Sequence, residues 1–254
     1  MTFIKRLFMF LISILIFFSI SNAQHFADLL SKNIIDKPSE SMNEAKSLVI
    51  NSEVYSPGGL LIEASYGITD RLTAGLSYGG WNIIGYGDME FNKKPGFYAK
   101  LKVLEDEFTC PSVCIGIETQ GKGIYNEFYE RYQVKSPGLF VVASKEFDWA
   151  GSFKFSGGVT YSLENKDSKS INPYVGVQKN IGQMFLFNTE FDFALNDNDK
   201  KYYGQGKVYL NIGCVIRLFE DKNTNLVFNL KDLLKNNKAE KSGRSIGLTY
   251  WWVF

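Results

Sequence analysis

Glu190 and Asp192 are the residues whose types and spacing come closest to catalytic chemistry. Because they lie two apart in a segment that alternates polar and apolar residues, both side chains are expected on one face of a strand. Two carboxylates on one face can share a proton or flank a glycosidic bond. The alternative is that both lie in a polar interior and pair with basic residues of the same inner surface. We adopt this alternative, with these candidate partners: Lys100, Lys102, Lys154 and Arg217.

Nucleophilic and metal chemistry lack their usual partner residues. The single histidine, His25, lies near the N-terminus, away from any candidate serine, whereas a histidine-activated serine hydrolase needs the two side by side. Cys110, Cys114 and Cys214 form no ligand cluster with His25. Cys110 and Cys114 are four residues apart, which in an extended strand separates them by about 13 Å, beyond the roughly 7 Å reach of a disulfide. We therefore predict free, buried thiols, no metal, no cofactor and no enzymatic activity.

Three short motifs fall in predicted loops. The "GKG" at 121–123 is too short for a phosphate-binding loop, and we interpret it as turn glycines. Asp88 and Glu90 of "GDMEFN" lack the spacing of a calcium-binding loop, so we interpret them as solvated acids. The aromatic residues of "YNEFYERY" (125–132) are suited to stacking on sugar rings or to anchoring at a membrane interface, and we favour anchoring.

From about residue 60 onward, the chain consists of segments in which apolar and polar residues alternate strictly. The candidate lumen residues lie in these segments. In "LLIEASYG" (60–67), for example, Leu60 and Ile62 share one face of a strand while Glu63 and Ser65 share the other. The alternation predicts twelve strands, near 47–55, 60–67, 72–80, 96–104, 112–120, 138–146, 152–163, 170–179, 184–195, 207–218, 225–232 and 245–254. Ten strands is the alternative count, because 47–55 alternates poorly and would then be a plug or an edge.

The connections between these segments are alternately short and long. Short turns such as "ITDR" (68–71) alternate along the chain with long polar loops, a pattern typical of an outer-membrane barrel. We therefore predict an all-β fold, an antiparallel, up-and-down, transmembrane β-barrel of about twelve strands with a short N-terminal helical or plug segment. Its narrow, mixed-charge lumen would be lined by Lys100, Lys102, Glu118, Lys154, Glu190, Asp192 and Arg217.

The N-terminal segment predicts export from the cytoplasm. Lys5 and Arg6 precede an apolar run, Leu7 to Ile20, and the small residues before Gln24 suit a signal peptidase. We predict a signal peptide over 1–23, cleaved after Ala23, a periplasmic helix or plug over 24–45, and the barrel over 46–254. Phe26, Leu29, Leu30 and Ile34 have the spacing of one helix face.

The C-terminal segment "SIGLTYWWVF" predicts a strand with one apolar face. Its outward residues resemble the terminal signal that outer-membrane assembly machinery recognises, and we expect that role for Ile246, Leu248, Tyr250, Trp252 and Phe254.

Several segments resemble the YjbH-like family of outer-membrane proteins. The resemblance rests on "PSVCIGIETQGKG" (111–123), "LFVVASKEFD" (139–148) with its box Val142-Ala143-Ser144-Lys145, "GSFKFSGGVTY" (151–161) and, upstream, "SYGITDRLTAGLSYGG". It implies an outer-membrane β-barrel associated with exopolysaccharide production or export. This chain is shorter than typical members and would be a single-barrel member.

The expected function is envelope transport or exopolysaccharide export through the lumen, in the outer membrane of a Gram-negative-type cell. The alternative is a structural or surface-interaction barrel that binds a glycan or protein through its external loops. Expected partners are outer-membrane lipid, the barrel assembly machinery and, under the first function, polysaccharide or export machinery. With 28 Lys and Arg against 27 Asp and Glu, we expect no nucleic acid.

Overall fold

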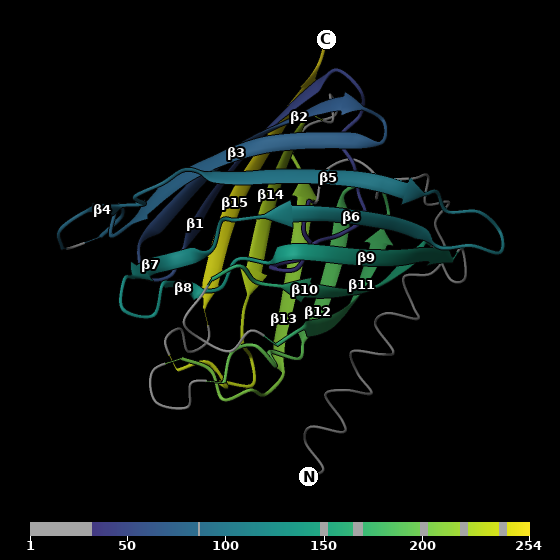
Figure 1. The fold of residues 1–254 in the computed structure, drawn as a ribbon. Helices are drawn as coiled ribbons and strands as arrows, with labels where there is room; N and C mark the ends of the chain where they lie inside the picture. The colour runs from purple at the N-terminus through teal and green to yellow at the C-terminus, as the bar shows by residue number, and fades with distance from the viewer. Residues whose placement is uncertain are drawn as a thin grey trace.

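A computed structural model describes residues 32–85, 87–147, 152–164, 170–198, 203–218, 223–238 and 243–254. Within these residues the chain forms a closed antiparallel barrel of twelve strands, in which each strand pairs with the next and the last pairs with the first (Figure 1). The barrel strands are β1 (Ser47–Tyr55), β2 (Gly59–Thr69), β3 (Leu72–Trp81), β5 (Gly96–Leu104), β6 (Ser112–Glu118), β9 (Gly138–Phe147), β10 (Phe153–Tyr161), β11 (Asn172–Ile181), β12 (Phe185–Asp192), β13 (Tyr209–Arg217), β14 (Thr224–Leu230) and β15 (Arg244–Val253). In the part of the chain described, no helix is long and apolar enough to cross a membrane.

The twelve-strand prediction is confirmed and the ten-strand alternative is wrong. β1 pairs with β15 along its whole length and with β2 from Leu48 to Tyr55. Its alternation is weak because its inner face mixes apolar Val49 with polar Asn51 and Glu53. That face packs against the inner segment rather than facing open water, so the usual difference in polarity between the two faces of the strand is reduced.

Connections of different length gather at the two ends of the barrel. Ser47 and Val253 are paired at one end, together with the short turns such as the one between β2 and β3; we call this the turn end. The long connections lie at the other end, the loop end, where β1 and β2 form the exception with a short link. Two elements there were not predicted: β4 (Glu90–Phe91), which pairs only with β3, and a separate hairpin of β7 (Lys122–Asn126) and β8 (Arg131–Val134).

The outer face of the wall is apolar and the inner face is polar. Along β2, Ile62 is half exposed on the outside, whereas Glu63 and Ser65 are buried. The same alternation places Phe187 outside and Asn188 inside on β12. Because successive side chains of a strand point to opposite faces, each strand contributes to both surfaces.

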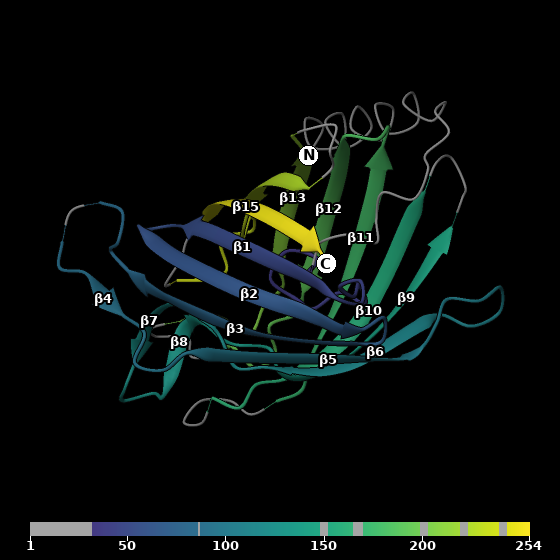
Figure 2. The same ribbon diagram turned by 90° about the horizontal axis from the view of Figure 1, so that it is seen from above.

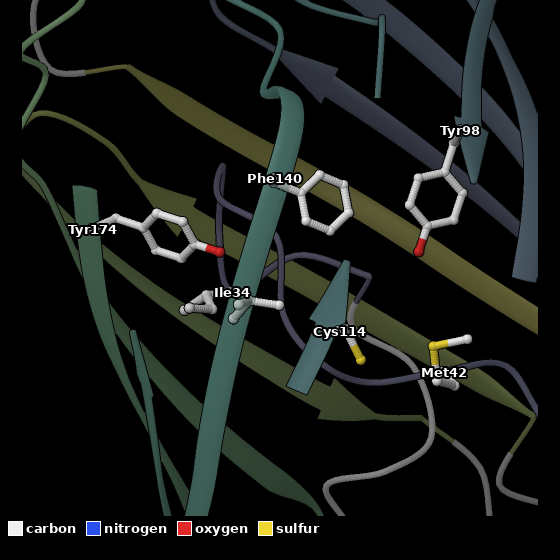
Figure 3. Packing of buried hydrophobic residues seen from close by; sticks show 7 residues of the cluster. Ile34, Met42, Tyr98, Cys114, Phe140 and Tyr174 are labelled. Atoms are coloured by element: carbon white, nitrogen blue, oxygen red, sulfur yellow. The ribbon is translucent and has the colours of Figure 1, made fainter. Parts of the chain in front are cut away.

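Residues 32–44, which we call the inner segment, run inside the ring of strands (Figure 2). Ile34 and Met42 pack there in an apolar cluster with three wall aromatics, Tyr98, Phe140 and Tyr174 (Figure 3). The predicted helix is wrong for its described part, because Ile34 lies in a tight turn closed by its N–H donating to the carbonyl of Lys37 at 2.8 Å. Residues 1–31, with the predicted signal peptide and the rest of that helix, lie outside the described residues.

Two wall glycines let the inner segment approach the strands closely. A Cβ at Gly67 would lie 1.9 Å from the carbonyl oxygen of Glu44, and one at Gly176 would lie 2.5 Å from the Cδ1 of Ile34. Because the backbone of Glu44 blocks a Cβ at Gly67, only glycine fits there, whereas a Cβ at Gly176 would require the side chain of Ile34 to shift.

Candidate functional site in the barrel lumen

Glu190 is completely buried and is bound by the backbone of the inner segment. The N–H groups of Ile35, Asp36 and Lys37 donate to its Oε2 at 3.0, 3.0 and 2.9 Å, and Asn211 donates to its Oε1 at 2.9 Å. Three consecutive N–H groups form a concave positive surface that suits a carboxylate. Glu190 therefore fixes the position of the turn at 34–37.

Three further predicted lumen residues, Asp192, Lys154 and Lys100, also contact the inner segment. Asp192 pairs with Lys37 at 2.9 Å, and Lys154 pairs with Glu40 at 2.8 Å. The ammonium of Lys100 donates to the carbonyls of Ser39, at 3.0 Å, and Ser41. The predicted pairing of Glu190 and Asp192 with Lys154 or Lys100 is thus wrong. The inner segment lies between the strands that carry the acids and those that carry the lysines, and its own residues bind both groups.

Two predicted residues lie nearer the turn end. Arg217 is buried on the inner face at the end of β13. Lys102 is half buried and lines a cavity of about 420 Å³ together with Glu40 and Lys154.

Glu118 takes part in a contact that the sequence did not reveal. The ammonium of Lys32 lies 2.5 Å from a carboxylate oxygen of Glu63 and 2.5 Å from one of Glu118. The same ammonium sits over the ring of Tyr98, 4.6 Å from its centroid. Two carboxylates and one aromatic face therefore surround a single ammonium group.

A second network near the loop end joins four charged residues. Asp36 accepts from Lys122 at 2.9 Å and from Lys231 at 2.8 Å, and both lysines also contact Glu53, at 2.8 and 3.1 Å. The prediction that "GKG" is only a turn is therefore wrong: Lys122 begins β7, which turns inward and brings its side chain into the lumen. Charges that alternate in this way compensate one another after removal from water.

The long connections pack together over the loop end. Arg131 of β8 is completely buried, pairs with Asp197 at 2.9 Å and lies over the ring of Tyr203, 4.0 Å from its centroid. Asp197 also accepts from the hydroxyl of Tyr209 at 2.8 Å. The interpretation of the aromatic residues of "YNEFYERY" as interface anchors is wrong for Tyr132, which is buried, while Phe128 is largely exposed.

Glu164 joins the β8 hairpin to the loop after β10. Its carboxylate accepts from the N–H of Ser136 at 2.7 Å and from that of Tyr132 at 3.0 Å. Burial raises the pKa of Glu164, and these hydrogen bonds oppose that rise without cancelling it.

Two small spaces lie beside residues 32–37 of the inner segment, on the loop-end side of the cavity next to Glu40. A cavity of about 90 Å³ lies next to Lys32 and Glu118, and one of about 50 Å³ lies next to Lys37 and Asp192. Each has room for a few water molecules. The described inner segment therefore leaves little free space around its turn at 34–37.

The three cysteines are free. Cys114 is buried and its thiol lies 3.2 Å from the carbonyl of Glu40. The prediction of buried thiols is wrong for Cys110, which is exposed, and holds only in part for Cys214, which is half-buried. Cys110 lies in the exposed turn-end connection between β5 and β6. Asp88 and Glu90 are exposed, as solvated acids would be.

The fold and the lumen define a closed, twelve-stranded antiparallel barrel whose charged interior is filled by its own N-terminal residues. No protein-family model and no curated protein matches the sequence. Among solved structures, the chain is similar to the KdgM porin, with a TM-score of 0.50, 8% identity and coverage of 80% of this chain and 98% of that one.

Two further porin-type structures give lower scores. The NanC porin has a TM-score of 0.46 at 10% identity, with 80% of this chain and 98% of that one covered. The outer membrane protein Omp33 of Acinetobacter baumannii has 0.43 at 9% identity, with 82% and 97% covered. At these identities the similarity to the KdgM porin shows the fold alone.

Proposed function

We propose that this protein is a non-enzymatic outer-membrane barrel that moves polar solutes across the envelope, with its lumen closed in this conformation by the inner segment as a plug. The observation that carries the proposal is one closed ring of strands with an apolar outer face and buried charges inside. A closed ring leaves no unpaired strand edge, which is what lipid requires of a spanning sheet. The turn end would face the periplasm and the loop end the outside.

Membership of the YjbH-like family and a role in exopolysaccharide export are a finer form of the same proposal. Of the box at 142–145, Val142 is completely buried and Ser144 hydrogen-bonds Ser156 at 2.7 Å, so these two residues have structural roles. A sugar chain is larger than the cavities of about 90 and 50 Å³ beside residues 32–37 of the plug. Export would therefore require the inner segment to leave the lumen.

The alternative, a barrel that binds a surface partner through its loops, is favoured by one observation. The loops are fixed to one another by fully buried contacts such as Arg131 with Asp197, which gives the loop end a defined surface. A binding surface needs that rigidity, whereas a pore mouth does not.

The test compares the full chain with the variant Lys32→Gln/Lys37→Gln, which removes two ammonium contacts of the plug. We expect both proteins to fractionate with the outer membrane and to change mobility on a gel when boiled in detergent. In planar bilayers we expect the unaltered chain to be closed and the variant to show conductance steps. The control Lys93→Gln/Lys94→Gln removes the same charge from an exposed loop and should stay closed. A folded variant that never conducts would favour the binding role.

The outward aromatic face of β15 gives a further prediction. Trp252 and Phe254 are exposed on the outside with their rings stacked at 5.5 Å. Deleting Phe254 is expected to lower the amount of heat-modifiable barrel in the outer membrane several-fold, because the proposed assembly signal loses its terminal aromatic. Deleting exposed Phe128 from the β7–β8 hairpin is the control. Equal assembly of both proteins would argue against the signal.

A further inference from the structure

We propose that Glu63, Glu118 and Tyr98 form a binding site for solutes that carry a primary ammonium group, and that Lys32 of the plug occupies this site in the closed conformation. We call these three residues the ammonium box. The inference rests on the proposed function, because the solute must enter the lumen in place of the plug.

The geometry of the box matches the bonding capacity of an ammonium group. An ammonium has three N–H donors and no acceptor, and the box offers it carboxylate oxygens from Glu63 and Glu118 at 2.5 Å each. The face of Tyr98, itself almost fully buried, lies 4.6 Å from the same nitrogen. Carboxylates together with an aromatic face, held away from water, are the recurrent means of recognising amines.

The box has more capacity than Lys32 uses. The second carboxylate oxygen of Glu118, Oε2, is buried and accepts no hydrogen bond from any described residue. It belongs to a side chain that lines the cavity of about 90 Å³ beside Lys32, which Gln120 and Asn51 also line. An unused buried acceptor next to free space leaves room for an amine that carries a further donor.

The charges of the surrounding wall favour a cation at this level. On the described barrel strands, the buried charged residues of the inner face in the half nearer the loop end are all acidic: Glu53, Glu63, Glu118, Glu190 and Asp192. Basic residues of the inner face, Lys100 among them, lie from the middle of the barrel toward the turn end. Lys122 of β7 and Lys231, which follows β14, also lie near the loop end and pair with Glu53. The five wall acids outnumber these two lysines, so a cation that enters from the loop end meets a net attractive field before it reaches the box.

A metal ion fits this site less well than an amine. Among the described residues, no group of three or more histidine, cysteine or acidic side chains is placed to hold a metal. The aromatic face of Tyr98 is a poor ligand for a hard cation, which prefers oxygen atoms, but it suits an ammonium.

The test measures binding of spermidine, a linear amine, to the purified full-length protein in detergent by titration calorimetry. We expect Lys32→Gln to bind spermidine at least tenfold more tightly than the unaltered chain, because the competing ammonium is gone. In the Lys32→Gln background, Glu118→Gln and Tyr98→Leu should each weaken binding at least tenfold. The control Lys93→Gln, which removes an exposed ammonium paired with Glu127, should bind like the unaltered chain.

The boiling-dependent gel shift identifies folded variants, and Glu118→Gln alone carries the comparison if Tyr98→Leu does not fold. Spermidine binding that is unchanged by Lys32→Gln, or by both box substitutions, overturns the ammonium box.

The binding measurement is made at equilibrium and does not require the barrel to conduct. If the box binds but no variant conducts, transport fails and the box stands. If variants conduct but the box substitutions do not affect spermidine binding, the box fails and transport stands.

Discussion

Replacing Glu190 by alanine is expected to free the turn at 34–37 from the wall and to expose its amides to solvent. The carboxylate accepts three backbone hydrogen bonds and one from Asn211, all in a fully buried position. A hydrogen bond to a buried charged group contributes roughly 1.5–3 kcal/mol. Losing the whole set should weaken docking of the turn by about 3 kcal/mol or more, equivalent to roughly a hundredfold in the docking equilibrium.

Hydrogen exchange at the amides of Ile35, Asp36 and Lys37 measures this effect directly. We expect exchange to speed up by about two orders of magnitude in Glu190→Ala, while amides in the middle of the strands remain protected. The matched control is Glu105→Ala, which removes an exposed carboxylate paired with Arg71 and should change stability by at most about 1 kcal/mol. Unchanged protection at the three amides would mean that the inner segment is held without Glu190.

Replacing Arg131 by methionine should open the loop end. The side chain is completely buried, pairs with Asp197, donates to the carbonyls of Tyr132 and Gln133, and packs on Tyr203. Methionine keeps most of the volume but leaves the carboxylate of Asp197 buried without its cation. Removing one partner of a buried ion pair costs roughly 3–5 kcal/mol, so we expect the connections 119–137 and 193–208 to separate.

Limited proteolysis of intact cells reports on that separation. The Arg131→Met variant should be cut in these connections far faster than the unaltered chain, while its barrel still shifts on a gel after boiling. Lys93→Met, at an exposed ion pair nearby, is the control and should resist like the unaltered chain. Arg131→Lys is expected to be intermediate, because an ammonium pairs with Asp197 but lacks the planar fork that reaches both carbonyls. Equal resistance of Arg131→Met would show that other contacts close the loop end.

The strands were predictable because side chains alternate between the two faces of the barrel wall. A residue of β2 or β12 faces either outside or inside according to its parity, and the two faces differ in polarity along most strands. The weakly patterned β1 was the least certain strand, because its alternation alone did not separate twelve strands from ten. The placement of Glu190, Asp192 and Lys154 on the inner face needs no more than this parity.

The partners of those residues were not predictable, because they come from a segment without a period. Residues 32–44 are held by single contacts from many strands, and a segment of that kind has no repeating face to detect. Lys37 and Glu40 look like ordinary polar residues around Pro38. Lys122 was misread for a related reason: flanking glycines indicate a turn, but they do not show that the turn folds back into the lumen.

The β1–β15 pairing also limits the order in which the barrel and its contents come together. β1 directly follows the inner segment, and its partner β15 is the last barrel strand along the chain. The seam between them, where the N–H of Phe254 also donates to the carbonyl of Lys46 at 3.1 Å, forms only after all other strands have been synthesised. Until that moment the wall has a gap beside the inner segment. The segment can therefore enter sideways before the seam closes, whereas afterwards it must thread through an end of the barrel.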